Sequence, residues 1–269
     1  MKSPTSRYRC PPVTGAAAGV TRSRWALHQR HDETVNARLE ELRKSISEHP
    51  GTRAHATWAR LRRTHEILAG NLREFDKLIA GPEQDWRLAL DLVSNTGSHD
   101  AEQEAYFNEF DRLLHNVVAA IGTLIDHTRV VARRYEGTPF YDDYVRRVQQ
   151  VGALPAARFV KDLRNYMLHQ SLPAPYNQVS LTQQDVTYQL QISVSALLQS
   201  SSWSGASRSY LAQHGDALPI REPFDQYTAA IEVLYEWMFG QSAGLDTAEI
   251  EAANVLIDEY NDVLTGRRR

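Results

Sequence analysis

The residues with the clearest capacity for chemistry form one short run in the second half of the chain, Arg164-Asn165-Tyr166-Met167-Leu168-His169. A histidine can move a proton near neutral pH. An arginine can hold a phosphate and the charge that develops on it, and a neighbouring asparagine can fix the tautomer of the imidazole. These residue types suit cleavage of a phosphodiester bond in RNA. That reaction needs no metal when the 2′-hydroxyl of the RNA is the nucleophile.

The spacing of these residues sets a geometric condition on such chemistry, because the run lies toward the end of a predicted helix. At about 100° per residue, Asn165 and His169 share a polar stripe with Arg158. Arg164 points about 120–140° away from His169. In a continuous helix Arg164 and His169 therefore do not reach one small target. Either the helix loosens near His169, or a second subunit supplies the other half of the site.

The run resembles the Arg-x4-6-His signature of the HEPN superfamily, in which Asn, Asp or His commonly follows the arginine. Many active members are metal-independent RNases, often toxins or defence effectors, that place two copies of the motif in a cleft at a homodimer interface. The resemblance implies that Arg164 and His169 are the catalytic pair and that Asn165 supports them. It also implies a homodimer, single-stranded RNA as substrate, an antitoxin or other protein as a possible partner, and no cofactor.

The elements that must position this run are mainly α-helical. Apolar residues recur at spacings of three and four, the pattern of amphipathic helices. This pattern predicts helices over about 32–48, 53–80, 85–93, 101–135, 141–151, 155–170, 205–213, 223–239 and 246–264. Between Pro175 and residue 195 the period changes to two, which predicts a β-hairpin at about 178–195. The predicted fold is a helical bundle with a β-hairpin inserted after the motif helix.

Three parts are predicted along the chain. Residues 1–30 are basic and lack an apolar period, so we expect a disordered tail. Residues 31–97 are expected to form an N-terminal helical region, and residues 98–265 a HEPN-like helical domain that contains the hairpin. Two features depart from the simplest HEPN pattern: the hairpin after the motif and the long helical region before it.

Composition limits the classes of function. The 269 residues include one cysteine, Cys10, so no intrachain disulfide can form, and a reducing cytoplasm is the expected location. No stretch approaches the roughly 18 apolar residues that span a bilayer, so no membrane association is expected. The net charge of -3 gives no overall attraction to nucleic acid. RNA binding would therefore need a local basic patch.

A candidate patch precedes and joins the motif. Its arginines are Arg129, Arg133, Arg134, Arg146, Arg147 and Arg158, and the aromatic residues Tyr135, Phe140, Tyr141 and Tyr144 lie among them. Such a mixture suits phosphate contacts and base stacking on single-stranded RNA. The alternative is an ordinary solvated surface in which the arginines pair with nearby acids such as Asp142 and Asp143.

Other chemistries have little support in the sequence. The ten histidines show no His-x3-His spacing, and no Cys-x2-Cys pair exists, so no metal site is expected. The sequence contains neither a phosphate-binding glycine loop nor a Gly-x-Ser-x-Gly elbow. The leading hypothesis is an RNA-binding or RNA-cleaving protein, a candidate metal-independent endoribonuclease. The competing hypothesis is a helical interaction or scaffold protein without catalysis.

Overall fold

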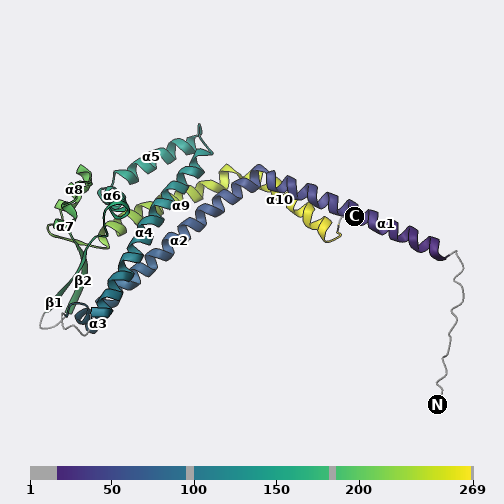
Figure 1. The fold of residues 1–269 in the computed structure, drawn as a ribbon. Coiled ribbons are helices and arrows are strands. Elements are labelled where there is room, and N and C mark those ends of the chain that lie inside the picture. Colours follow the sequence, from purple (N-terminus) through teal and green to yellow (C-terminus); the bar gives the residue numbers. More distant parts are fainter. Residues whose placement is uncertain (1–16, 95–99, 182–185, 268–269) are drawn as a thin grey trace, which may run out of the picture. The chain divides into compact units, whose positions relative to one another are not determined.

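The computed structural model describes residues 17–94, 100–181 and 186–267, and these ranges are mainly α-helical (Figure 1). The helices are α1 (Ala17–Glu48), α2 (Pro50–Gln84), α3 (Trp86–Asp91), α4 (Asp100–Arg133), α5 (Pro139–Ala153), α6 (Pro155–His169), α7 (Val194–Leu198), α8 (Gly205–Ala212), α9 (Glu222–Leu245) and α10 (Thr247–Leu264). The strands are β1 (Pro175–Leu181), β2 (Val186–Ser193) and β3 (Ala217–Pro219). The predicted mainly α fold is confirmed.

The predicted hairpin is present directly after the motif helix. Strands β1 and β2 pair antiparallel from Pro175 opposite Ile192 to Leu181 opposite Val186. The residues that join them, 182–185, lie outside the described ranges. The short strand β3 extends the sheet on the other side of β2, in the order β1-β2-β3. Neither β3 nor the short helix α7 was predicted, because three and five residues are too few to show a period.

The chain forms two compact units, which differ from the predicted division at residue 97/98. The main unit contains residues 56–245, and the terminal unit combines the chain before residue 56 with the chain after residue 245. Most of α2 belongs to the main unit because its apolar side chains share a core with α4. Phe75 of α2 packs against Phe110 of α4 and edge-on against Phe224 of α9, with ring centroids 5.9 and 5.7 Å away.

The terminal unit is built on α1, α10 and the first turn of α2. Helices α1 and α10 pack together, and Arg38 of α1 pairs with Glu259 of α10 at 2.6 Å. Gly51 lies so close to α10 that a Cβ there would be 2.0 Å from the carbonyl oxygen of Glu249. Helix α1 begins at Ala17, so residues 17–30 are helical where a disordered tail was predicted. Residues 1–16 of that predicted tail lie outside the described ranges.

Helix α6 is held in the main unit by one apolar face. Its residues Ala156, Ala157, Phe159, Val160 and Leu163 are buried, and the helix packs against α4, α5, α8 and α9. Because the apolar residues occupy one side, the polar residues of the helix are left at the surface. The sequence-predicted polar and apolar stripes of this helix are therefore present in the fold.

Candidate functional site

Helix α6 carries the motif residues as a continuous, regular helix. It runs from Pro155 to His169, and the backbone N–H of Gln170 still donates to the carbonyl of Tyr166 at 2.8 Å. The helix therefore does not loosen before His169. Of the two arrangements that would bring Arg164 and His169 together, only the one that uses a second subunit agrees with this geometry.

The three motif residues are exposed and available to a ligand. Arg164, Asn165 and His169 each present their side chain to solvent. Within the described ranges none of these three side chains forms a hydrogen bond or an ion pair. Arg164 lies over Gly122 of α4, where a Cβ would approach its Nε to 3.2 Å. The glycine thus gives the guanidinium room to lie against α4.

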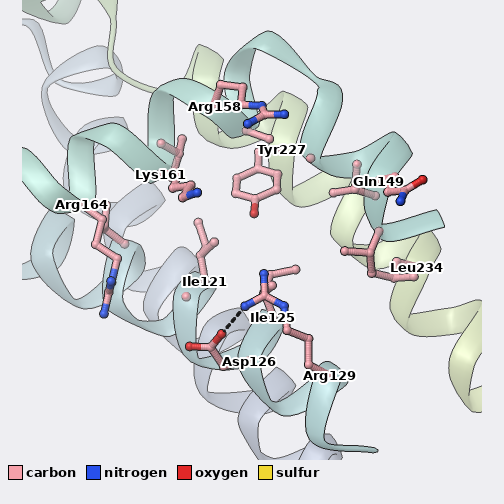
Figure 2. A pocket seen from close by; sticks show the side chains of 17 residues that line it. Ile121, Ile125, Asp126, Arg129, Gln149, Arg158, Lys161, Arg164, Tyr227 and Leu234 are labelled. Atoms are coloured by element: carbon pink, nitrogen blue, oxygen red, sulfur yellow. Dashed lines mark hydrogen bonds and ion pairs between the residues drawn. The ribbon is translucent and has the colours of Figure 1, made fainter. Parts of the chain in front are cut away.

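A cavity of about 480 Å³ lies between α4, α5, α6 and α9, and Arg164 forms part of its edge (Figure 2). Its lining residues are Val118, Ile121, Gly122, Ile125, Asp126, Arg129, Val148, Gln149, Val151, Gly152, Ala157, Arg158, Val160, Lys161, Arg164, Tyr227 and Leu234. The apolar members include buried side chains, such as Val160 at 2% exposure. The cationic members are all exposed. The cavity therefore has an apolar floor and a basic rim.

The rim carries an excess of positive charge. Its four cations, the rim cations, are Arg129, Arg158, Lys161 and Arg164. Arg129 is paired with Asp126 at 2.6 Å. Asp126 is the one carboxylate among the described lining residues. No ion pair to Arg158, Lys161 or Arg164 occurs in the part of the chain that the structure describes. Such a rim attracts an anion.

Tyr227 of α9 adds a polar group to the apolar floor. Its side chain lies among the lining residues, with Arg158 and Lys161 on one side and Ile125 and Arg129 on the other (Figure 2). Burial raises the pKa of its hydroxyl, and the nearby charge of Arg129 opposes that rise only in part. The hydroxyl is therefore protonated at neutral pH and can donate a hydrogen bond to a ligand.

The cavity brings together some of the predicted site residues and excludes others. Arg129 and Arg158, which belong to the predicted RNA-binding patch, and Arg164, predicted to be catalytic, all line it. Asn165 and His169 are not among its described lining residues. The predicted catalytic set is therefore divided within one protomer: Arg164 faces the cavity, and the other two residues lie outside it.

The remaining predicted RNA-binding arginines lie away from the cavity. Arg146 is paired with Asp143 at 2.6 Å, as in the solvated-surface alternative. The guanidinium of Arg147 lies 4.6 Å from the ring centre of Trp237, and its Nε is buried without a hydrogen-bond partner among the described residues. Arg133 and Arg134 are exposed and do not line the cavity. These four residues are therefore not part of the described cavity rim.

Lys161 and Tyr227 were missed by the sequence predictions. Lys161 had a signal, because Arg158, Lys161 and Arg164 recur at intervals of three and so follow a slanted stripe along one helix. No sequence signal marked Tyr227 as a site residue, because an aromatic residue on a helix is equally compatible with a position in the core.

Asp162, which precedes Leu163 on α6, has a structural role. Its Oδ2 accepts hydrogen bonds from the backbone N–H of Ser204, at 3.0 Å, and from the hydroxyl of Ser207, at 2.7 Å. Burial alone would raise the pKa of this carboxyl, but the bonds from both serines outweigh burial and lower it. Asp162 therefore anchors the start of α8 to α6 through Oδ2.

Comparisons with family models, with curated proteins and with solved structures find no match for this chain. In the described ranges, no group of three or more His, Cys, Asp and Glu side chains is placed to hold a metal ion. No described helix is both long enough and apolar enough to cross a membrane.

Proposed function

We propose that the protein binds single-stranded RNA along α6 and, as a homodimer, cleaves it without a metal ion. One observation carries the proposal. Arg164, Asn165 and His169 are exposed on an ordered helix, and their side chains form no hydrogen bond or ion pair with a described residue. Phosphate groups are the natural ligands of such guanidinium groups. Arg158 and Lys161 of the same helix extend the cationic surface along which a phosphate chain can lie.

Each motif residue has a role in this proposal. One imidazole takes the proton from the 2′-hydroxyl, whose oxygen then attacks the adjacent phosphorus. A second imidazole gives a proton to the departing 5′-oxygen, so that the P–O5′ bond breaks and a 2′,3′-cyclic phosphate remains. Arg164 stabilises the negative charge that builds on the phosphate oxygens. One chain supplies one motif histidine, so two copies of His169 fill the roles of base and acid in a symmetric dimer.

The proposal is tested by cleavage of mixed single-stranded RNA in excess EDTA. We expect His169→Ala to lower the cleavage rate roughly 100- to 10,000-fold. Arg164→Lys should also lose RNA cleavage, because the point charge of an ammonium group does not reproduce the forked hydrogen-bond donors of the guanidinium. The matched controls are His115→Ala and Arg146→Lys, which change exposed residues outside the motif and the cavity lining. Both controls should retain the wild-type rate, and circular dichroism should show all four variants folded.

The assembly and the alternative function are tested with the same preparations. Light scattering at micromolar concentration should give a dimer. A strict monomer that cleaves RNA would contradict the proposed division of roles between two subunits. RNA binding without any cleavage by the wild type would overturn the catalytic part of the proposal. Absence of both activities would favour the helical interaction protein.

A further inference from the structure

The floor of the cavity needs an explanation that the RNA proposal does not give. A phosphate chain is bound by exposed cations, which the rim supplies, and it gains nothing from buried aliphatic side chains beneath them. Yet the floor is formed by aliphatic side chains from four helices: the buried Val118 and Ile121 of α4, Val160 of α6 and Leu234 of α9, and the half-buried Val151 of α5. Aliphatic surface beside open space favours an aliphatic ligand.

We propose that this cavity binds a small amphipathic anion, with an aliphatic body on the floor and a carboxylate or phosphate head at the rim. The head is specified by charge, because three of the rim cations have no ion pair among the described residues and the lining holds one described carboxylate, Asp126. The aliphatic body of the ligand is inferred from the apolar side chains that line the cavity. At about 480 Å³, the cavity lies within the usual range for small-molecule sites, roughly 300–1,000 Å³.

Two polar groups of the cavity can form hydrogen bonds that orient the ligand. The hydroxyl of Tyr227 is a neutral donor among the apolar side chains, and it can bond an oxygen of the head. Gln149 of α5 is exposed and brings an amide to the opposite wall from α6. Arg158, Lys161 and Arg164 belong to both the cavity and the proposed RNA surface. The floor belongs to the cavity alone, so substitutions there separate the two functions.

The site is tested first with wild-type protein by calorimetric titration at low ionic strength. Octanoate and octyl phosphate represent the two heads, and hexanoate shortens the body by two methylenes. Hexanoate should bind about 15-fold more weakly than octanoate. Octylammonium, which has the same body and the opposite charge, should not bind. Adenosine monophosphate has a phosphate head like octyl phosphate but a flat, polar body. It should therefore bind more weakly than octyl phosphate.

A pair of glycine variants then places the ligand in the cavity. Gly152 lines the cavity in α5, and a Cβ there meets no atom within 4 Å, so Gly152→Leu puts its side chain into the open space. Gly240 of α9 is also helical and unobstructed, but it is not among the described lining residues. Gly152→Leu should abolish octanoate binding, and Gly240→Leu should leave the Kd unchanged.

The outcomes are decisive in both directions. Equal affinity for hexanoate and octanoate, or for octanoate and octylammonium, would overturn the proposal. Tighter binding of adenosine monophosphate than of octyl phosphate would replace the aliphatic body with a nucleotide and overturn it as stated. Unchanged binding by a folded Gly152→Leu protein would place the ligand elsewhere. If Gly152→Leu does not fold, the chain-length and charge comparisons on wild type still decide the result.

Discussion

Replacing Asp162 should loosen the attachment of α8 to α6. In Asp162→Ala, the hydroxyl of Ser207 loses its acceptor while it stays buried, at 0% exposure, which costs about 1–3 kcal/mol. The backbone N–H of Ser204 also loses its acceptor, but Ser204 is exposed and water replaces the carboxylate there. The expected loss in the free energy of unfolding is therefore about 1–3 kcal/mol. Asp162→Asn keeps an acceptor oxygen and should lose about 1 kcal/mol.

Urea unfolding followed by circular dichroism measures these losses, and a double-mutant cycle with Ser207→Ala isolates the shared bond. Since both single substitutions remove the same hydrogen bond, the double variant should lose about 1 kcal/mol less than the sum of the two. Additive losses would show that the carboxylate and the hydroxyl do not interact in solution. A loss below about 0.5 kcal/mol in Asp162→Ala would show that water replaces both bonds.

The pH dependence of the same variants gives an independent check. The pKa of Asp162 is lower in the folded protein than in an unfolded chain. Its stabilisation is therefore fully present above the unfolded value of about 3.9 and is lost as the pH falls through the lowered folded value. The difference in unfolding free energy between wild type and Asp162→Asn should be constant from about pH 5 to 7 and shrink below about pH 4. A difference that grows with acid would refute this assignment.

Three further predictions concern other parts of the chain. Gly51→Ala should lower the free energy of unfolding by more than about 2 kcal/mol, because a Cβ there meets the backbone of α10. Hydrogen–deuterium exchange measured by mass spectrometry should then be faster at the amides of α10. The control Gly70→Ala, where a Cβ has room, should leave this exchange unchanged. Burial raises the pKa of Asp111, whose Oδ1 has no partner among the described residues, so the charged form destabilises the fold as pH rises. Asp111→Asn should therefore raise the thermal midpoint at pH 7 but not at pH 3. Lys161→Ala should weaken RNA binding by roughly 1 kcal/mol and lower the slope of log K against log salt by about 0.7.

The sequence predicted the elements well where one periodicity runs over many residues. Helices α4 and α6 and the β1–β2 hairpin lie close to their predicted ranges, because each has a long apolar stripe or a clear alternation. The buried face of α6, with Phe159 and Leu163, was also readable, since the spacing of apolar residues fixes which side of a helix faces the core.

The arrangement in space was less predictable because it depends on packing between distant segments. The terminal unit joins α1 to α10, more than 190 residues later, through contacts such as the ion pair between Arg38 and Glu259. Nothing local in either segment specifies the other. The cavity has the same origin, because its lining comes from four helices whose relative positions no single periodicity encodes. Of the lining residues, only the cations of α6 follow a spacing in the sequence that would place them on one stripe of a helix.

The geometry of α6 also decides what its motif can do. A regular helix sends Arg164 toward the cavity over Gly122 and sends His169 about 140° away, so one protomer offers a phosphate ligand on one side and a proton carrier on another. The two functions proposed here therefore place different demands on the same helix. Binding of a small anion uses the cavity side of one chain and needs no partner. Cleavage of RNA needs His169 from two chains together with Arg164, so it should depend on protein concentration where anion binding does not.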